Sequence, residues 1–220
     1  MTDIADRQGG GGLGVLVVDM VRALADETVP GHEPDGPPAA ERCRLLLDAA
    51  RTAGLPIWFT RGGKRWHTST ASPLSTVERG GWLRRNGWKR DPPEVAELAM
   101  EIAPRLAPRP GEVVLTKSKP SAFFGTPLIS QLLSARVSEL VVVGMMTSGC
   151  VRATVTDAFS YDLDVTIPVD CVADRDAAAH EANLRDIGRK YATLLDARGF
   201  SALIGRLEGA RPSHMGRHKG

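Results

Sequence analysis

Features that mark several classes of protein are missing from this sequence of 220 residues. It has only three cysteines, at positions 43, 150 and 171, without a CxxC pair or a Cys/His cluster, which argues against a disulfide scaffold or a structural zinc site. No apolar run approaches the roughly 18 residues that span a bilayer. The N-terminal segment also lacks the basic and apolar regions of a secretory signal. We therefore expect a cytoplasmic protein with free thiols and no membrane partner.

Neither sign of charge dominates the sequence. It contains 28 basic and 26 acidic residues, for a net charge of +2. This near-balance gives no electrostatic case for nucleic acid or an anionic membrane as the main partner. Local basic clusters at 84–90 and 211–220 are interpreted as solvated faces or tails. A small-molecule substrate is the partner that the composition leaves open.

The hydrophobic content of 42% is enough for a real core, and the length suits one large α/β domain. We expect this domain to span residues 14–207, after a glycine-rich, flexible lead-in at 1–13 and before a flexible tail at 208–220. Residues 62–92 have a loop-like composition. A loop of that length suggests a lid, a binding loop or an oligomer contact.

Apolar runs and helix-periodic segments alternate along the chain. Strands are predicted at 14–20, 55–61, 112–117, 138–145 and 164–172, and helices at 39–54, 92–104, 126–137, from Cys150 onward, and at 178–197. The strands are continuously apolar, which is typical of a parallel sheet covered on both faces. The predicted fold is therefore α/β, a three-layer Rossmann-like arrangement with a mostly parallel sheet of about six strands and helices on both faces.

Polar or reactive residues stand at the carboxyl ends of three predicted strands, where working residues of such sheets gather: Asp19, Lys117 and Cys150. Each has a plainer interpretation, as a helix cap, a surface lysine or a packed thiol. Together they form a nucleophile set, in which Asp19 takes the thiol proton and the charge of Lys117 favours thiolate.

The position of Cys150 strengthens this interpretation. A cysteine in the first turn of a helix has its thiol pKa lowered by the unsatisfied N–H groups and the helix dipole, and the same N–H groups can receive an oxyanion. Cys43 falls within a predicted helix and Cys171 late in a predicted strand, so both are expected to be structural.

Several long segments resemble the isochorismatase-like cysteine hydrolases: "VLVVDM", "AARTAGLPIWFTRGG", "VVLTKSKPSAFFGTPL", "VVVGMMTSGCVRATVTDAFSYDLDVTIPVDCVADRD" and "HEANLRDIGRKYATLL". The resemblance runs from about Gly14 to Leu195. "TKSKPSAFFGT", "TSGCVRAT" and the "HEANL" segment are most similar to the N-carbamoylsarcosine amidase and maleamate amidase branch.

The resemblance implies roles for particular residues. The aspartate, lysine and cysteine of the family match Asp19, Lys117 and Cys150, and the spacing to "SAF" selects Lys117 over Lys119. It also implies a non-proline cis peptide between Met145 and Met146. That bond would turn the Met146 N–H towards the Cys150 N–H to form an oxyanion hole.

Two departures from relatives within the superfamily bear on the chemistry. Nicotinamidases carry an Asp-x-His metal site after the second strand, whereas this chain has "FTRGGKRWHTS", with no Asp before His67. We therefore expect no catalytic metal and no cofactor. Members that hydrolyse the vinyl ether of isochorismate often lack the cysteine, so its presence here favours cleavage of a C–N bond.

Residues of the substrate pocket are predicted from weaker signals. Phe123 and Phe124 can wall a small apolar pocket or pack in the core. Arg61 and Arg175 can pair with a substrate carboxylate or form surface salt bridges. Thr147 can hydrogen-bond the substrate amide or stabilise its own turn.

The sequence therefore predicts a cysteine-dependent amidohydrolase that cleaves a small acid amide or ureido compound through a thioester and releases ammonia. Two alternatives stay open. One is an isochorismatase-type vinyl-ether hydrolase, and the other is a member that binds a small ligand without turning it over. The resemblance also implies a homo-oligomer, a tetramer or a dimer.

Overall fold

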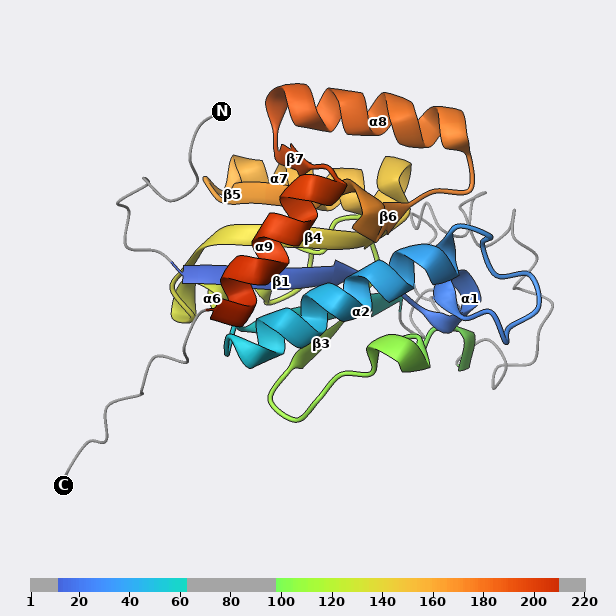
Figure 1. Ribbon diagram of the computed structural model, residues 1–220, viewed down its shortest axis with the longest axis horizontal. Coiled ribbons are helices and arrows are strands. Elements are labelled where there is room, and N and C mark those ends of the chain that lie inside the picture. Colours follow the sequence, from blue (N-terminus) through green and yellow to red (C-terminus); the bar gives the residue numbers. More distant parts are fainter. Residues whose placement is uncertain (1–11, 63–97, 210–220) are drawn as a thin grey trace.

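The computed structural model describes residues 12–62 and 98–209, and these form a parallel sheet with helices on both faces (Figure 1). The strands run in the spatial order β3-β2-β1-β4-β5-β7, and the short β6 also pairs with β4. Their bounds are β1 Gly12–Val18, β2 Ile57–Gly62, β3 Val113–Lys117, β4 Val137–Met145, β5 Asp164–Pro168, β6 Val172–Ala173 and β7 Thr193–Leu195. Every pairing between these strands is parallel, which confirms the predicted α/β class.

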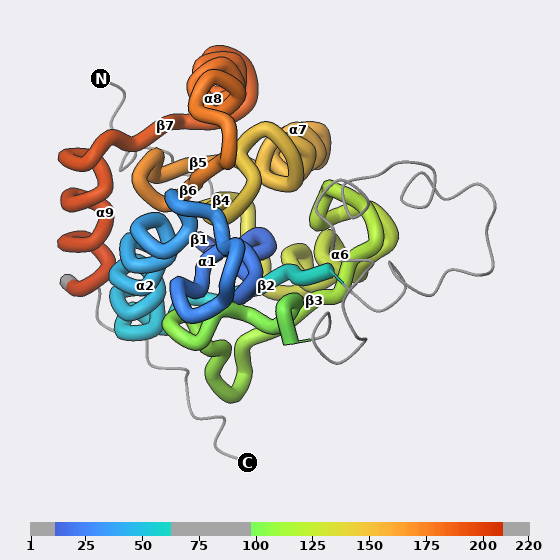
Figure 2. The backbone as a smooth tube through the Cα atoms, turned by 90° about the vertical axis from the view of Figure 1, so that its right-hand side faces the viewer, coloured from blue at the N-terminus to red at the C-terminus, as the bar shows by residue number. Residues whose placement is uncertain are grey.

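The helices form the outer two layers, as the view in Figure 2 shows. Helices α2 (Gly36–Thr52) and α9 (Ala197–Gly209) lie together on one face, and α6 (Leu128–Ser134), α7 (Arg152–Ser160) and α8 (Ala177–Lys190) lie on the other. The short α1 (Arg22–Ala25) follows β1 directly. None of the described helices is long and apolar enough to cross a membrane.

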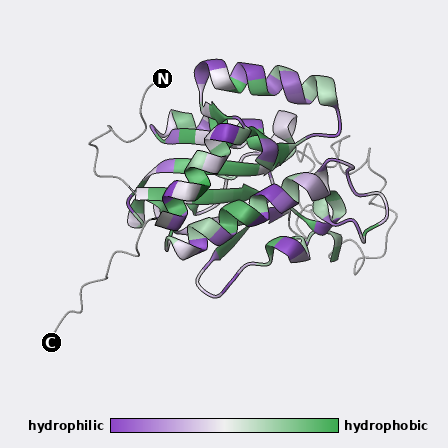
Figure 3. Cartoon of the chain, in the orientation of Figure 1, coloured by the Kyte–Doolittle hydropathy of each residue, from purple (hydrophilic) through white to green (hydrophobic). Residues whose placement is uncertain are grey.

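Alternate side chains of β1 point to opposite faces of the sheet, and the core is divided into two halves accordingly. Val15 and Val17 pack into the half under α2 and α9, while Leu16 and Val18 pack into the half under α6, α7 and α8. All four side chains are fully buried, so this strand is apolar on both faces. The strands are correspondingly hydrophobic in Figure 3, whereas α8 is largely hydrophilic. Both Cys43 and Cys171 lie in the first half of the core, as expected of structural thiols.

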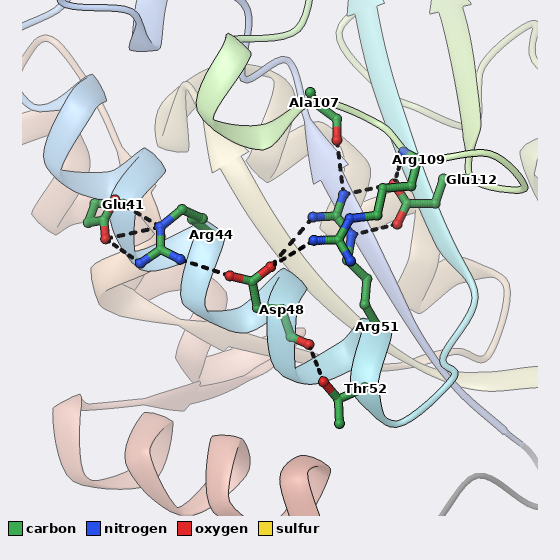
Figure 4. A network of polar contacts seen from close by, with 8 residues as sticks. All are labelled: Glu41, Arg44, Asp48, Arg51, Thr52, Ala107, Arg109 and Glu112. Atoms are coloured by element: carbon green, nitrogen blue, oxygen red, sulfur yellow. Dashed lines mark hydrogen bonds and ion pairs between the residues drawn. The ribbon is translucent and has the colours of Figure 1, made fainter.

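An ion-pair network fastens α2 to the segment that leads into β3 (Figure 4). The Arg51 guanidinium donates to both carboxylate oxygens of Glu112, at 2.7 and 2.9 Å, and also to the Ala107 carbonyl. Both side chains of this ion pair are about nine-tenths buried. A bidentate, poorly hydrated pair of this kind holds the edge of the sheet to the helix layer.

The chain departs from three of the predicted elements. The helix predicted at 92–104 was wrong at its C-terminal end, because Ile102 forms an antiparallel bridge with Val21 and a 3-10 turn covers Pro104–Leu106. Residues 164–172 were predicted as one strand, but β5 ends at Pro168, a 3-10 turn covers Val169–Cys171, and β6 then pairs with β4. The predicted helix at 178–197 was wrong in its second half, because α8 ends at Lys190 and Thr193–Leu195 form an edge strand beside β5. The additional helix α9 follows, and residues 63–97, which hold most of the predicted loop, lie outside the described residues.

Candidate active site

The parallel arrangement brings the ends of β1, β3 and β4 to one edge of the sheet, and with them the three predicted catalytic side chains. Asp19 directly follows β1, Lys117 is the last residue of β3, and Cys150 lies in the turn after β4. The Lys117 ammonium lies 2.6 Å from Asp19 Oδ2 and donates a 3.3 Å hydrogen bond to Cys150 Sγ. Lysine therefore stands between the carboxylate and the thiol.

Asp19 leaves the strand in an unusual conformation. Its φ is +50°, in the left-handed region that few residues other than glycine adopt. Thr60 in β2 holds it there, because the Asp19 N–H donates to the Thr60 carbonyl while the Thr60 hydroxyl donates to Asp19 Oδ1 at 2.8 Å. The sharp change of direction aims the carboxylate at Lys117 instead of along the strand, and strain of this kind is typical of functional sites.

Lys117 is among the most buried charged residues of the described chain, at 2% exposure. Besides Asp19 and Cys150, its ammonium donates to the Lys119 carbonyl at 3.1 Å. Burial by itself lowers the pKa of Lys117, but the interactions of its ammonium with the Asp19 carboxylate and the Cys150 sulfur outweigh burial, and the net pKa is raised. The lysine is therefore a permanent cation in the site.

The thiol of Cys150 differs from the sequence expectation. Burial, and next the negative charge of Asp19, raise its pKa from 9.0 to about 12, and the opposing effect of Lys117 is smaller. The predicted lowering of the thiol pKa was therefore wrong, because the helix start and the lysine were weighed without the desolvation of the sulfur. A thiol with this pKa is protonated at neutral pH, so the site holds a neutral thiol beside the Asp19–Lys117 ion pair.

The turn that carries Cys150 begins with a cis peptide bond between Met145 and Met146. A π-helical turn, η4 (Thr147–Val151), follows and continues into α7. Gly144, just before, has a φ of +126°, and a Cβ there would lie 2.0 Å from the Val18 carbonyl oxygen. The end of β4 thus approaches the end of β1 more closely than any side chain would permit.

Sequence reasoning missed residues that support the site without touching the thiol. Thr60 holds Asp19, as described above. Asp174, directly after β6, accepts hydrogen bonds from both the N–H and the hydroxyl of Ser148, at 2.7 and 2.6 Å. His180 Nδ1 lies 2.9 Å from the Thr147 hydroxyl. The only signal in the sequence was a polar residue just past an apolar run, as in "DCVADRD" for Asp174.

The predicted pocket residues are placed in different settings. Phe123 is 5% exposed and packs in the core beside the Tyr161 ring, whereas Phe124 is 65% exposed. Arg61 is half-buried near the end of β2, and Arg175 forms an ion pair of 2.7 Å with Glu33. Their roles in binding a substrate stay predictions, as does the role of Thr147.

Within residues 12–62 and 98–209, no group of three or more His, Cys, Asp or Glu side chains is arranged to hold a metal ion. His67 lies outside the described residues, so the expectation of a metal-free site stays a prediction.

Comparisons with known proteins identify the family of this chain. Residues 14–198 match the model of the isochorismatase domain. The maleamate amidohydrolase of Pseudomonas putida is 33% identical over 177 residues, which cover 80% of this chain and 79% of that protein. The N-carbamoylsarcosine amidase of an Arthrobacter species is 33% identical over 181 residues, or 80% of this chain and 65% of that protein.

A solved structure supports the fold. The crystal structure of a cysteine hydrolase from Pseudomonas syringae pv. phaseolicola superposes with a TM-score of 0.72, covering 90% of this chain and 93% of that one at 22% identity. The two chains therefore share a fold.

Proposed function

The chain belongs to the isochorismatase family of hydrolases, and from that premise we propose that it is a cysteine-dependent amidohydrolase acting on a small acid amide or ureido compound. The observation that carries the proposal is the Lys117 ammonium held between the Asp19 carboxylate and the Cys150 thiol. A nucleophile, a base and a fixed cation within hydrogen-bonding reach are what cleavage of an amide through a covalent intermediate requires.

In the first half of the reaction, Asp19 takes the thiol proton as the sulfur attacks the carbonyl carbon. Because the thiol pKa is about 12, this proton must leave during the attack and not before it. The ammonium of Lys117 stays charged and stabilises the negative charge that moves between carboxylate and sulfur. Asp19 then gives its proton to the leaving nitrogen, the C–N bond breaks, and ammonia departs from a thioester on Cys150.

The second half regenerates the thiol. Asp19 removes a proton from water, the hydroxide oxygen attacks the thioester carbonyl, and the C–S bond breaks as the sulfur recovers a proton. We assign the oxyanion in both halves to the N–H groups of Met146 and Cys150. Support for Cys150 comes from its place in the first turn of a helix, where backbone N–H groups have no partner within the helix.

The substrate class follows the relatives, whose names specify maleamate and N-carbamoylsarcosine. Both are small molecules with a carboxylate and a terminal amide, and Arg61 and Arg175 are the proposed partners for such a carboxylate.

We further propose that the protein acts in the cytoplasm as a homo-oligomer, a tetramer or a dimer. Light scattering by the purified chain measures that state directly, and a monomer at all concentrations would contradict it.

Ammonia release from a panel of small amides and ureido acids tests the function, together with mass spectrometry of the enzyme after brief exposure to substrate. We expect turnover of at least one carboxylate-bearing amide and an acyl adduct on Cys150. Cys150→Ala should abolish turnover in a folded protein, while the control Cys43→Ala, which removes a buried thiol outside the site, should keep it. Retained activity in Cys150→Ala would refute the mechanism. Cleavage of a vinyl ether without any adduct would favour the isochorismatase-type alternative.

A further inference from the structure

The turn that presents Cys150 has no cap of its own. Its N-cap residue is Met146, whose side chain makes no capping hydrogen bond. The first N–H groups of a helical segment have no partner within it, so an outside acceptor has to satisfy them. The Ser148 N–H finds that acceptor in the Asp174 carboxylate, 26 residues further along the chain.

The contact is made by a single buried oxygen. Asp174 Oδ2 accepts from the Ser148 N–H at 2.7 Å and from the Ser148 hydroxyl at 2.6 Å, and Asp174 is 5% exposed. Its other oxygen, Oδ1, lies 3.4 Å from the Asp176 N–H, a longer and weaker contact. Hydrogen bonds to a carboxylate are stronger than neutral ones, and a negative charge at a helix start is favourable.

The fold explains how Asp174 reaches the turn. The register of the short strand β6 against β4 pairs Gly144 with Val172 and Met145 with Ala173. The next residue on the β6 side is Asp174, which therefore leaves the sheet beside the first residues of the turn. The interruption of the predicted strand 164–172 thus has a structural consequence, because the chain turns at Val169–Cys171, β6 pairs with β4, and Asp174 comes within hydrogen-bonding distance of Ser148.

We propose that Asp174 is a positioning residue, which caps η4 from the residue after β6 and thereby holds the Cys150 thiol against Asp19 and Lys117. The assignment builds on the proposed function in one respect, since it takes Cys150 to be the nucleophile. A second contact, between His180 Nδ1 and the buried Thr147 hydroxyl, holds the same turn from α8. Misplacing a reacting group by an ångström costs on the order of a hundredfold in rate.

The chain offers a matched set of variants. Asp174→Asn places an amide oxygen where Oδ2 lies, so it can accept both bonds from Ser148 but loses the charge. Asp174→Ala loses the charge and both bonds. The control is Asp176→Ala, because the Asp176 side chain caps α8 through the Ala179 N–H and makes no contact with the turn among the described hydrogen bonds.

The deciding measurement is the second-order rate of Cys150 alkylation by iodoacetamide at pH 8, with folding checked by circular dichroism. A loosened turn moves the sulfur away from Asp19, so its pKa falls and alkylation becomes about threefold faster for each unit of that fall. We expect Asp174→Ala to react faster than Asp174→Asn, and Asp176→Ala to react as the wild type does. Equal rates in Asp174→Ala and Asp174→Asn would show a charge effect alone and overturn the proposal.

Turnover of maleamate or N-carbamoylsarcosine, whichever the wild type accepts, gives a second readout. Asp174→Ala should lower kcat on the order of a hundredfold with little change in KM, because the geometry of attack changes more than substrate binding. Asp174→Asn should recover kcat to within about fivefold of the wild type, because it keeps both bonds in a weaker neutral form. If the wild type hydrolyses no amide, the proposed function fails, yet the alkylation contrast still decides the role of Asp174.

Discussion

The raised pKa of the Cys150 thiol makes an unusual prediction for Asp19→Asn. The variant keeps the size and the acceptor oxygen that the Thr60 hydroxyl bonds to, but it removes the negative charge beside the sulfur. Lys117 is then left without its carboxylate, and a thiolate becomes its natural counter-ion. We therefore expect the variant to lose catalysis while its thiol becomes more reactive towards a simple alkylating agent.

The magnitude follows from the pKa of about 12, against 9.0 for an ordinary cysteine. Each unit by which the pKa falls increases the thiolate fraction at pH 8 tenfold, but the thiolate itself becomes less nucleophilic, which leaves a net gain of about three- to fourfold. Burial persists in the variant, so the pKa does not fall the whole way. The expected gain lies between about threefold and about fiftyfold.

The assay compares iodoacetamide labelling of wild type and Asp19→Asn from pH 7 to 10, read by intact mass. Cys150→Ser gives the background, and the buried Cys43 and Cys171 should contribute little to it. Thermal unfolding checks that the variant is folded. Labelling that is unchanged or slower in a folded variant would refute the view that the charge of Asp19 keeps the thiol protonated. Retained hydrolysis would refute its role as the base.

Two further predictions concern stability. Burial acts to raise the pKa of Glu112, but hydrogen bonds from Arg51 and the Arg109 N–H outweigh it, and the net pKa lies below 4.5. Because the folded-state pKa is lowered, the ionised Glu112 stabilises the fold above pH 4.5, and this stabilisation is lost as the pH falls. Glu112→Gln should therefore lower the free energy of unfolding, measured in urea, by about 1.5–3 kcal/mol at pH 7 and by distinctly less at pH 4. A difference between wild type and variant that does not change with pH would contradict this. Gly144→Ala should fail to fold or lose more than about 3 kcal/mol in thermal unfolding, because its Cβ would overlap the Val18 carbonyl. The control Gly205→Ala, in α9 with open space around it, should be neutral or stabilising by up to about 1 kcal/mol, and similar losses in both variants would rule out the overlap as the cause.

The meeting of Asp19, Lys117 and Cys150 at one edge of the sheet was predictable because its signal is local. Asp19 and Lys117 end continuous apolar runs, and Cys150 follows another run after a short turn. The carboxyl ends of parallel strands meet at one edge whatever the loops between them do. The class of fold came from the same runs. No contact between distant residues had to be known for either inference.

What the sequence could not provide depends on long-range contacts. Residues 193–195 continue a helix-like pattern, and only pairing with β5 makes them a strand. The direction of the thiol pKa depends on how far water is excluded from the sulfur and on its distance from Asp19, and neither quantity is visible in the order of residues. The link from Asp174 to Ser148 likewise exists only because β6 returns to the end of β4.

The raised pKa of the Cys150 thiol also predicts how the protein withstands oxidising conditions. Peroxides attack thiolates and hardly react with thiols, so a cysteine with a pKa of about 12 is almost inert to them at neutral pH. We therefore expect the Cys150 sulfur to stay reduced in the resting site. Under the proposed mechanism the thiol reacts only when a carbonyl carbon is in place to accept the sulfur as its proton leaves. The resistance of Cys150 to oxidation then depends on the same Asp19 carboxylate that is proposed to start the reaction.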